Sequence, residues 1–232
     1  MTAAARNGDD SGAPRQRGGP VAAGSGTPAR RRGRPPAAHS SAGDTRERIV
    51  RAAVELFADK GFHGTGVAEI GDRADVQRGA LYYHIGSKEE LLWEILRDYI
   101  QLMRDDAEQI AASGHDPITK LHKLIQSYVA LIIAHRREVA IQLRDVTALT
   151  GERATQLQDL RDDVQDCWQR VLDDGYAAGL LRTADHVITN SLLGMLNMIT
   201  VWYRPDGNHS PGEIADLLAT TFLDGITTES TQ

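Results

Sequence analysis

A short stretch between residues 61 and 92 carries most of the side chains that could recognise another molecule. Five of them fall on the outward side of one expected short helix: Gln77, Arg78, Tyr82, Tyr83 and His84. In the major groove of DNA, arginine can pair with guanine and glutamine with adenine. Tyrosine and histidine can donate hydrogen bonds to phosphate oxygens. This combination of residue types predicts a surface that reads double-stranded DNA.

Two short helices joined by a tight turn must position these side chains. Hydrophobic spacing predicts one helix over residues 67–74 and a second over 77–84, with Asp75 and Val76 in the turn between them. The side chains expected to turn inward are Val67, Ile70, Ala74, Ala80 and Leu81. This arrangement is typical of a helix-turn-helix, whose second helix enters the major groove. Lys88 follows in the first turn of the next helix, where it can clamp a phosphate.

The same stretch resembles the DNA-binding part of the tetracycline-repressor (TetR) family of bacterial transcription regulators, over about residues 45–105. The residues that carry the resemblance are Gly61, Phe62, Thr65, Val67, Ile70, Ala74, Val76, Gly79, Leu81, Tyr82, His84, Ser87, Lys88 and Leu91. The resemblance implies that the phosphate contacts are made by Thr65, Tyr82, His84 and Lys88. It implies that the residues nearest the bases are Gln77, Arg78, Gly79 and Tyr83. The chain departs from the family pattern at Gly71, Asp75, Gln77 and Ile85.

The basic charge of the chain is concentrated at its N-terminus. The 232 residues carry 26 Lys and Arg against 32 Asp and Glu, yet residues 1–43 hold seven Arg and only two Asp. Because this segment has few large apolar side chains, we expect a disordered basic tail. Residues 30–36, which include Arg32 and Arg34, resemble an AT-hook. Arginine is attracted to the narrow minor groove of A·T-rich DNA, so the segment either enters that groove or is a solvated linker.

The rest of the chain has the periodicity of helices. Apolar residues recur at three- and four-residue spacing beyond residue 44, which predicts an all-α fold of about nine or ten helices. Expected helix starts are Asp44 with Glu47, Ser87 with Glu90, Asp116 with Pro117, and Ser210 with Glu213; Gly61 is an expected stop. We expect a three-helix DNA-binding domain over residues 45–105. A helical effector-binding and dimerisation domain is expected over 106–232.

The late helices are candidates for a dimer interface. One helix-turn-helix reads only a few base pairs, so dimers bind two half-sites ~34–36 Å apart. The segments best suited to a homodimer interface are 154–179 and 185–203, and packing within one subunit is the alternative reading. The family resemblance implies that these segments form a four-helix bundle across a two-fold axis.

The region 106–204 is expected to bind a small-molecule effector. Its polar and aromatic candidates are His122, Tyr128, Gln142, Arg144, Asp145, Arg161, Trp168, Arg170, Asn190, Asn197 and Trp202. The pattern from Val171 to Gly179, together with Trp202 to Gly207 and Asp224 to Thr227, resembles an actinobacterial branch that regulates fatty-acid and steroid breakdown. That resemblance implies an acyl-CoA effector, with Arg161 and Arg170 near the CoA phosphates. A multidrug-type regulator that senses aromatic compounds is the alternative.

Other classes of protein fit the sequence less well. A single cysteine, Cys167, excludes an intrachain disulfide and a zinc finger. No nucleophile–base pair or metal-ligand set is evident, so we expect neither an enzyme nor a cofactor or bound metal. Polar residues interrupt the apolar stretch 187–203, so we expect a cytoplasmic protein with no membrane partner. The predicted function is repression that an effector relieves; an activator, or an architectural DNA-binding protein without an effector, is the alternative.

Overall fold

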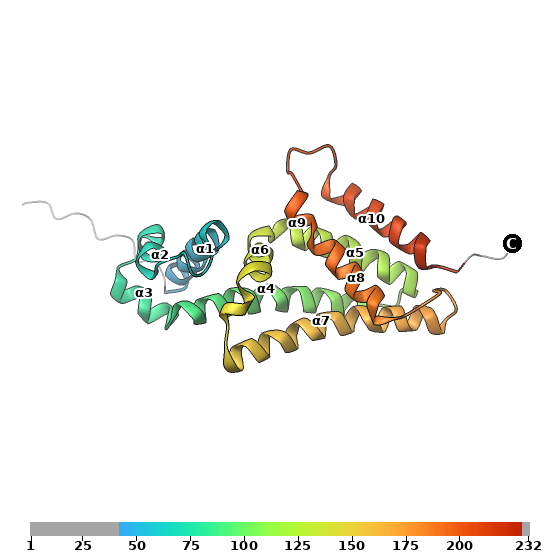
Figure 1. The fold of residues 1–232 in the computed structure, drawn as a ribbon, viewed down its shortest axis with the longest axis horizontal. Coiled ribbons are helices and arrows are strands. Elements are labelled where there is room, and N and C mark those ends of the chain that lie inside the picture. The colour runs from blue at the N-terminus through green and yellow to red at the C-terminus, as the bar shows by residue number, and fades with distance from the viewer. Residues whose placement is uncertain (1–41, 229–232) are drawn as a thin grey trace, which may run out of the picture. The chain divides into compact units, whose positions relative to one another are not determined.

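The computed structural model describes residues 42–228, and every regular element in that range is a helix (Figure 1). The elements are α1 (Ala42–Lys60), α2 (Val67–Ala74), α3 (Arg78–Ile85), α4 (Lys88–Ala111), α5 (Pro117–Ala134), α6 (Arg136–Asp145), the 3₁₀ turn η1 (Val146–Ala148), α7 (Gly151–Ala177), α8 (His186–Asn197), α9 (Ile199–Trp202) and α10 (Pro211–Ile226). The all-α prediction is therefore confirmed.

Side-chain caps set the starts of α4, α5, α8 and α10. The Asp116 side chain accepts a hydrogen bond from the Thr119 N–H, and Ser210 and Glu213 form a reciprocal capping box. Ser87 accepts from the Glu90 N–H at 3.0 Å. The expected cap at Asp44 is wrong, because α1 already includes Asp44 in its first turn.

The first three helices enclose a small apolar core. Ile49, Leu56 and Phe57 of α1 are fully buried, as are Ile70 of α2 and Leu81 of α3. Burial of this apolar surface is the main force that holds such short helices together, because helices of eight residues are marginal in isolation. The core therefore fixes the angle at which α3 is presented.

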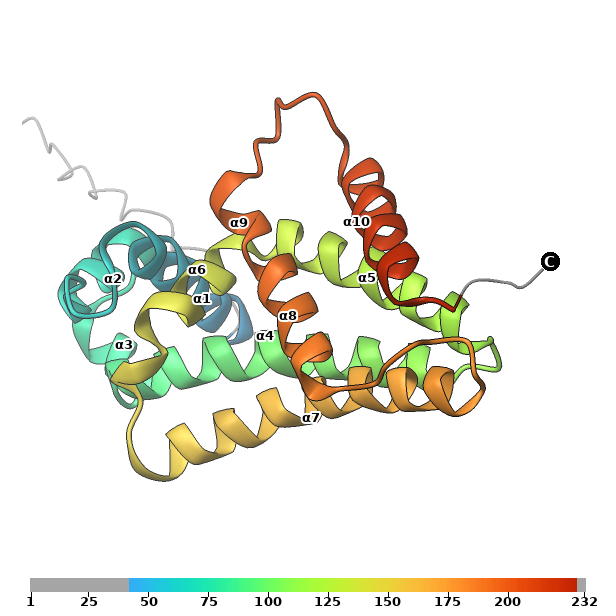
Figure 2. The ribbon, with the colours of Figure 1, turned by 45° about the vertical axis from the view of Figure 1, so that its right-hand side comes forward.

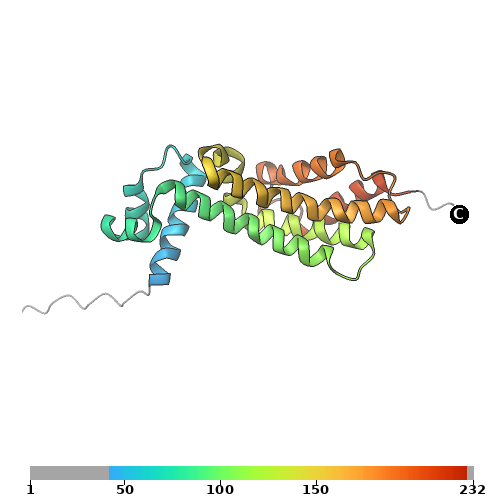
Figure 3. The ribbon, with the colours of Figure 1, turned by 90° about the horizontal axis from the view of Figure 1, so that it is seen from below.

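Helix α4 belongs to both halves of the described chain. It begins beside α3 and continues for 24 residues along α7, and the two helices lie side by side in Figure 3. The expected domain boundary at residues 105 and 106 falls inside this continuous helix. A displacement of α4 against α7 would therefore be carried directly to the first three helices.

The C-terminal half is built around Trp168, which is fully buried. Helix α10 packs against α5, and α8 and α9 also contact α5 (Figure 2). The segment 185–203, one of the two expected interface segments, is two helices divided at Met198, and its Trp202 side chain is half exposed. Between residues 42 and 228, none of the helices has both the length and the apolar character needed to cross a membrane.

Candidate nucleic-acid interface and effector cavity

The turn between α2 and α3 is tight, as the sequence indicated. Asp75 has a φ of 53°, in the left-handed region, and is the one non-glycine residue of the described range with positive φ. The Val76 N–H bonds to the Gly71 carbonyl oxygen at 2.9 Å and closes the turn. Asparagine and aspartate adopt this conformation more readily than other non-glycine residues, so Asp75 can replace the glycine usual at this place.

Helix α3 presents a continuous set of exposed residues. These are Gln77, Arg78, Gly79, Tyr82 and Tyr83. Tyr83 is 86% exposed, and Arg78 lies 5.9 Å from the Tyr82 ring with no carboxylate partner among the described residues. His84 is half-buried and stacks edge-on against Tyr83. An aromatic side chain left this open is unusual in a folded chain, so this face is suited to contact another molecule.

The prediction that Ala80 of α3 turns inward is wrong. Ala80 is exposed, whereas Leu81 and Ile85 are buried. The helix starts at Arg78, and its buried side is defined by two residues four positions apart. Ala80 therefore lies beside the exposed set rather than in the core.

The structure contradicts the phosphate role expected for the Thr65 side chain. Thr65 is 2% exposed, and its hydroxyl lies 2.8 Å from the Gly61 carbonyl oxygen and 3.2 Å from that of Leu56. A buried hydroxyl must find a partner inside the protein, and here it ties the end of α1 to the following loop.

Lys88 is also committed to the interior of the described chain. Its ammonium group donates to the carbonyl oxygens of Phe62 and Thr65, at 2.9 and 3.0 Å, and lies 4.3 Å from the Phe62 ring. Lys88 therefore holds the loop between α1 and α2 from the side of α4. These contacts use two of its three donors, and the phosphate contact expected for Lys88 stays a prediction.

Arg46 positions α3, a role that sequence reasoning missed. Its guanidinium donates to the backbone carbonyl oxygen of His84 and to the carboxylate of Glu94. The first contact joins α1 to the C-terminal end of α3, and the second joins it to α4. The partners are 38 and 48 residues away in sequence, so no local pattern identifies them.

Arg144 and Asp145 also act at the base of α1 rather than in a cavity. Asp145 is buried and accepts a hydrogen bond from the Phe62 N–H at 3.2 Å. Arg144 pairs with Asp145 and donates to the carbonyl oxygens of Phe57 and Ala58. These contacts supply donors to the C-terminal carbonyl groups of α1.

The tail residues Arg32 and Arg34 lie outside the described residues.

A cavity of about 220 Å³ lies between α4, α5, α6, α7 and α8 and is partly open to solvent, because Gln158, Arg161 and Asn190 on its wall are exposed. Five of the expected effector residues line it: Tyr128, Gln142, Arg161, Asn190 and Asn197. The sequence-based selection therefore identified polar groups from four of the contributing helices.

Tyr128 is the most firmly placed of these groups. Its hydroxyl donates to the Asn197 side-chain oxygen at 3.2 Å, and its ring meets the Trp168 ring edge-to-face at 5.4 Å. Burial raises the pKa of Tyr128 to about 12, against the opposing effects of Asn197 and Arg161. The phenol is therefore neutral at ordinary pH, and its one donor is directed at Asn197, which also lines the cavity.

The other expected effector residues lie elsewhere. His122 faces Asp216 of α10 at 3.8 Å, and Trp202 lies on the exposed side of α9. Arg170 pairs with Glu108 on the outer side of α4 and α7. Trp168 is fully buried behind Tyr128 and does not line the cavity. These four residues were chosen by type, and type alone does not say which side of a helix faces a cavity.

A polar stripe on α7 and a mixed stripe on α8 complete the cavity wall. Gln158, Arg161, Asp162 and Gln165 lie on α7, and Asn190, Leu193, Gly194 and Asn197 lie on α8. Both sets have the three- and four-residue spacing of one helix face. That spacing on α7 is a signal by which Gln158, Asp162 and Gln165 could have been found from sequence. No group of three or more His, Cys, Asp or Glu side chains in residues 42–228 is arranged to hold a metal ion.

Comparison with known proteins covers both halves of the chain. Residues 49–95 match the family model described as bacterial regulatory proteins, tetR family, and residues 114–226 match the one described as tetracyclin repressor-like, C-terminal domain. The transcriptional repressor KstR2 of Rhodococcus jostii is 32% identical over 197 residues, which are 83% of this chain and 97% of the relative.

Solved structures of similar proteins also match over most of the chain. The ketosteroid transcriptional regulator KstR2 of Mycobacterium tuberculosis matches with a TM-score of 0.73 and 26% identity, over 79% of this chain and 95% of that one. AibR, in complex with isovaleryl coenzyme A and operator DNA, matches with a TM-score of 0.70 and 27% identity, over 76% and 97%.

Proposed function

Because the chain belongs to the TetR family of bacterial transcriptional regulators, we propose that it is a repressor that leaves its operator when an effector binds. The single observation that carries this proposal is the pairing of an exposed polar face on α3 with a polar cavity. The two features are joined through α6, which contributes Gln142 to the cavity and Asp145 to the loop before α2.

In this proposal, α3 enters the major groove. Arg78 and Gln77 lie at the N-terminal end of the helix, where side chains reach base edges. Tyr82, Tyr83 and His84 contact phosphates or bases nearby. We place the DNA contacts on these side chains and the backbone of Gly79, and assign Thr65 to supporting the loop.

We further propose that the effector is an acyl-CoA thioester whose acyl group enters the cavity. Support comes from the relatives, one a ketosteroid regulator and another bound to isovaleryl coenzyme A. A cavity of about 220 Å³ is below the ~300–1,000 Å³ typical of sites for whole drug-sized ligands. It is therefore suited to a short acyl portion, whose thioester carbonyl oxygen would replace the Asn197 side-chain oxygen as the acceptor of the Tyr128 hydroxyl.

The homodimer is proposed to form through α8 and α9. An exposed apolar stripe runs along these helices and consists of Val187, Met195, Met198, Val201 and Trp202. Contiguous exposed apolar residues mark interaction surfaces in soluble proteins. A two-fold pairing through this stripe would give the two α3 helices that a palindromic operator needs.

Release from the operator depends on the thermodynamic linkage between effector binding and DNA binding. An effector moves the protein off DNA only if it binds the DNA-incompetent state more tightly than the competent one. A ligand that displaces Gln142 would shift α6, and Asp145 would carry the shift to the loop before α2. The coupling needs no contact between effector and DNA.

The DNA-binding part is tested by selecting binding sites from a random double-stranded pool with the full chain. Arg78→Ala is then compared with Arg182→Ala, whose exposed side chain lies outside the first three helices. We expect Arg78→Ala to weaken the selected site by about tenfold to a hundredfold, as for loss of a base contact worth ~1–3 kcal/mol. Equal binding by both variants would contradict the assignment of α3.

The effector part is tested by thermal shift with isovaleryl-CoA, isovalerate and free coenzyme A. A ligand that binds the native state raises the melting temperature. We expect stabilisation by the thioester, reduced in Tyr128→Phe and retained in Lys123→Ala, which changes an exposed residue of the same helix. Stabilisation that is equal in both variants would place the acyl group outside the cavity.

A further inference from the structure

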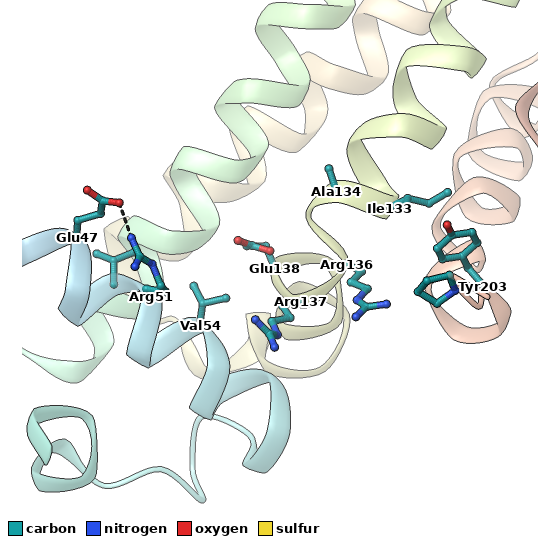
Figure 4. Close-up of a pocket in the computed structure, with 11 residues that line it drawn as sticks. Glu47, Arg51, Val54, Ile133, Ala134, Arg136, Arg137, Glu138 and Tyr203 are labelled. Atoms are coloured by element: carbon teal, nitrogen blue, oxygen red, sulfur yellow. Dashed lines mark hydrogen bonds and ion pairs between the residues drawn. The ribbon is translucent and has the colours of Figure 1, made fainter. Parts of the chain in front are cut away.

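A second and larger cleft lies at the N-terminal end of α6. Its volume is about 620 Å³, and its walls come from α1, the junction of α5 with α6, and the segment after α9 (Figure 4). The lining residues are Glu47, Val50, Arg51, Val54, Ile133, Ala134, Arg136, Arg137, Glu138, Tyr203 and Pro205. None of these residues lines the cavity between α4, α5, α6, α7 and α8. The two spaces therefore have separate walls.

Three arginines from two helices face this cleft. Arg51 pairs with Glu47 at 2.6 Å, and Arg137 lies 3.9 Å from Glu55 on α1. Arg136 has no hydrogen bond or ion pair with any other described residue, and its side chain extends toward Tyr203 in Figure 4. The cleft therefore contains one guanidinium with all its donors available and two more that a stronger anion could recruit.

Apolar side chains also line the cleft. Val50 and Val54 of α1, Ile133 of α5 and the half-buried Tyr203 supply this surface. A guanidinium fork matches the oxygen spacing of a phosphate, and aromatic and apolar side chains accept the flat face of a ring. We propose that the cleft binds a phosphorylated nucleoside, with the phosphates on Arg136 and Arg137 and the base against Tyr203.

Size supports a ligand of this class. The cleft falls within the ~300–1,000 Å³ range of small-molecule sites, whereas the smaller cavity falls below it. A nucleoside diphosphate combines a ring system with negative charge, and the cleft offers both apolar side chains and arginines to contact them. Such a ligand could be a free nucleotide or the nucleotide portion of a CoA thioester.

Because of its position, the cleft allows a bound ligand to affect the spacing between α1 and α6. Its walls join α1, which carries the Arg46 contacts to α3, with α6, which carries Asp145. A ligand that touches both walls favours the spacing between them that it fits. The proposal goes beyond repression and does not depend on it, because binding can be measured without DNA.

The test is calorimetric titration of the full chain with ADP, adenosine, inorganic phosphate and coenzyme A. We expect ADP to bind, and the double variant Arg136→Gln with Arg137→Gln to weaken it by at least tenfold. The control Arg182→Gln removes an exposed arginine outside the cleft and should leave the affinity unchanged. Coenzyme A binding that competes with ADP and is tighter identifies the CoA thioester as the source; equal affinities identify the free nucleotide.

Three results would overturn the proposal. The first is no heat of ADP binding at millimolar concentration. The second is loss of ADP binding in Arg161→Gln but not in the Arg136 and Arg137 variant, which would move the nucleotide to the smaller cavity. The third is inorganic phosphate binding as tightly as ADP, which would remove the role of the ring. Operator binding by the same variants, measured separately, shows whether the repressor proposal stands when this one fails.

Discussion

The carboxylate of Asp145 lies 3.2 Å from the backbone nitrogen of Phe62, which joins the last residue of α6 to the loop between α1 and α2. The carbonyl oxygen of the same Phe62 accepts a hydrogen bond from Lys88 of α4 at 2.9 Å. The loop that precedes α2 is therefore held by α6 on one side and by α4 on the other. Both helices also line the cavity between α4, α5, α6, α7 and α8.

Replacing Asp145 with alanine should loosen this connection. The change leaves the Phe62 N–H without its partner and removes the charge that faces Arg144, so we expect a loss of about 1–3 kcal/mol in the free energy of unfolding. We also expect an effector to release operator DNA less completely, because α6 no longer holds the loop. Urea denaturation and operator release by the effector measure the two effects.

Asp159→Ala is the matched control for this change. Asp159 is exposed on α7 and has no side-chain partner among the described residues. It should change neither quantity. A normal release of operator DNA by the Asp145 variant would show that α4 alone carries the coupling.

Replacing Arg46 with alanine should weaken operator binding without changing its dependence on salt. Arg46 holds the C-terminal end of α3 through the His84 carbonyl oxygen and does not itself lie on the exposed face. We expect about a tenfold loss of affinity for the selected operator, equal to ~1.4 kcal/mol. The slope of affinity against salt should stay the same, because that slope counts phosphate contacts.

Arg46→Lys should recover part of the affinity, because one donor can still reach the carbonyl oxygen. A slope that falls by about one unit in Arg46→Ala would instead indicate a direct phosphate contact. In that case the positioning role would be wrong, whatever the change in affinity.

The sequence predicted the features that depend on neighbouring residues. Asp116 with Pro117, Ser210 with Glu213 and the left-handed turn at Asp75 each involve residues a few positions apart. Caps, turns and helical spacing predict these features, and each depends on residues that are close in sequence. The exposed face of α3 was predicted for the same reason.

Contacts between distant segments could not be predicted in this way. Thr65 matches the family position for a phosphate contact, yet its burial turns the hydroxyl inward. Arg46 reaches residues 38 and 48 positions away, and Asp145 reaches one 83 positions away. Such pairs depend on how the helices pack, which a single sequence does not specify. The same limit explains why Arg170 and Trp202 were expected in a cavity that they do not line.

A charged residue on the stripe of α8 and α9 should dissociate the proposed homodimer. Trp202 is 50% exposed in one chain, and Trp202→Glu would place a carboxylate in the apolar contact. We expect sedimentation to show a monomer, and operator affinity to fall because one half-site is lost. Leu217→Glu is the control, since Leu217 is 62% exposed on α10. Dissociation by Leu217→Glu but not by Trp202→Glu would place the interface on α10.

Cys167 should react slowly with alkylating reagents. It is 3% exposed, its Sγ lies 3.1 Å from the Glu108 carboxylate, and Arg170 lies 3.3 Å from the sulfur. Burial first, and then Glu108, raise the pKa of Cys167 from 9.0 to about 11. Since the thiolate is the reactive form, the folded protein at pH 8 should hold about a hundredfold less thiolate than an unperturbed cysteine.

The two neighbours act on this thiol in opposite directions, which makes the assignment testable. Glu108→Gln should lower the pKa of Cys167 and speed labelling by iodoacetamide, whereas Arg170→Gln should raise the pKa and slow it. Labelling in urea should be equal in all three proteins. Because the folded pKa lies above the unfolded value, the thiol contributes stability that is present below pH 9 and lost as the pH rises toward 11. Shifts of the same sign in both variants would mean that access to the sulfur, rather than its charge environment, controls the rate.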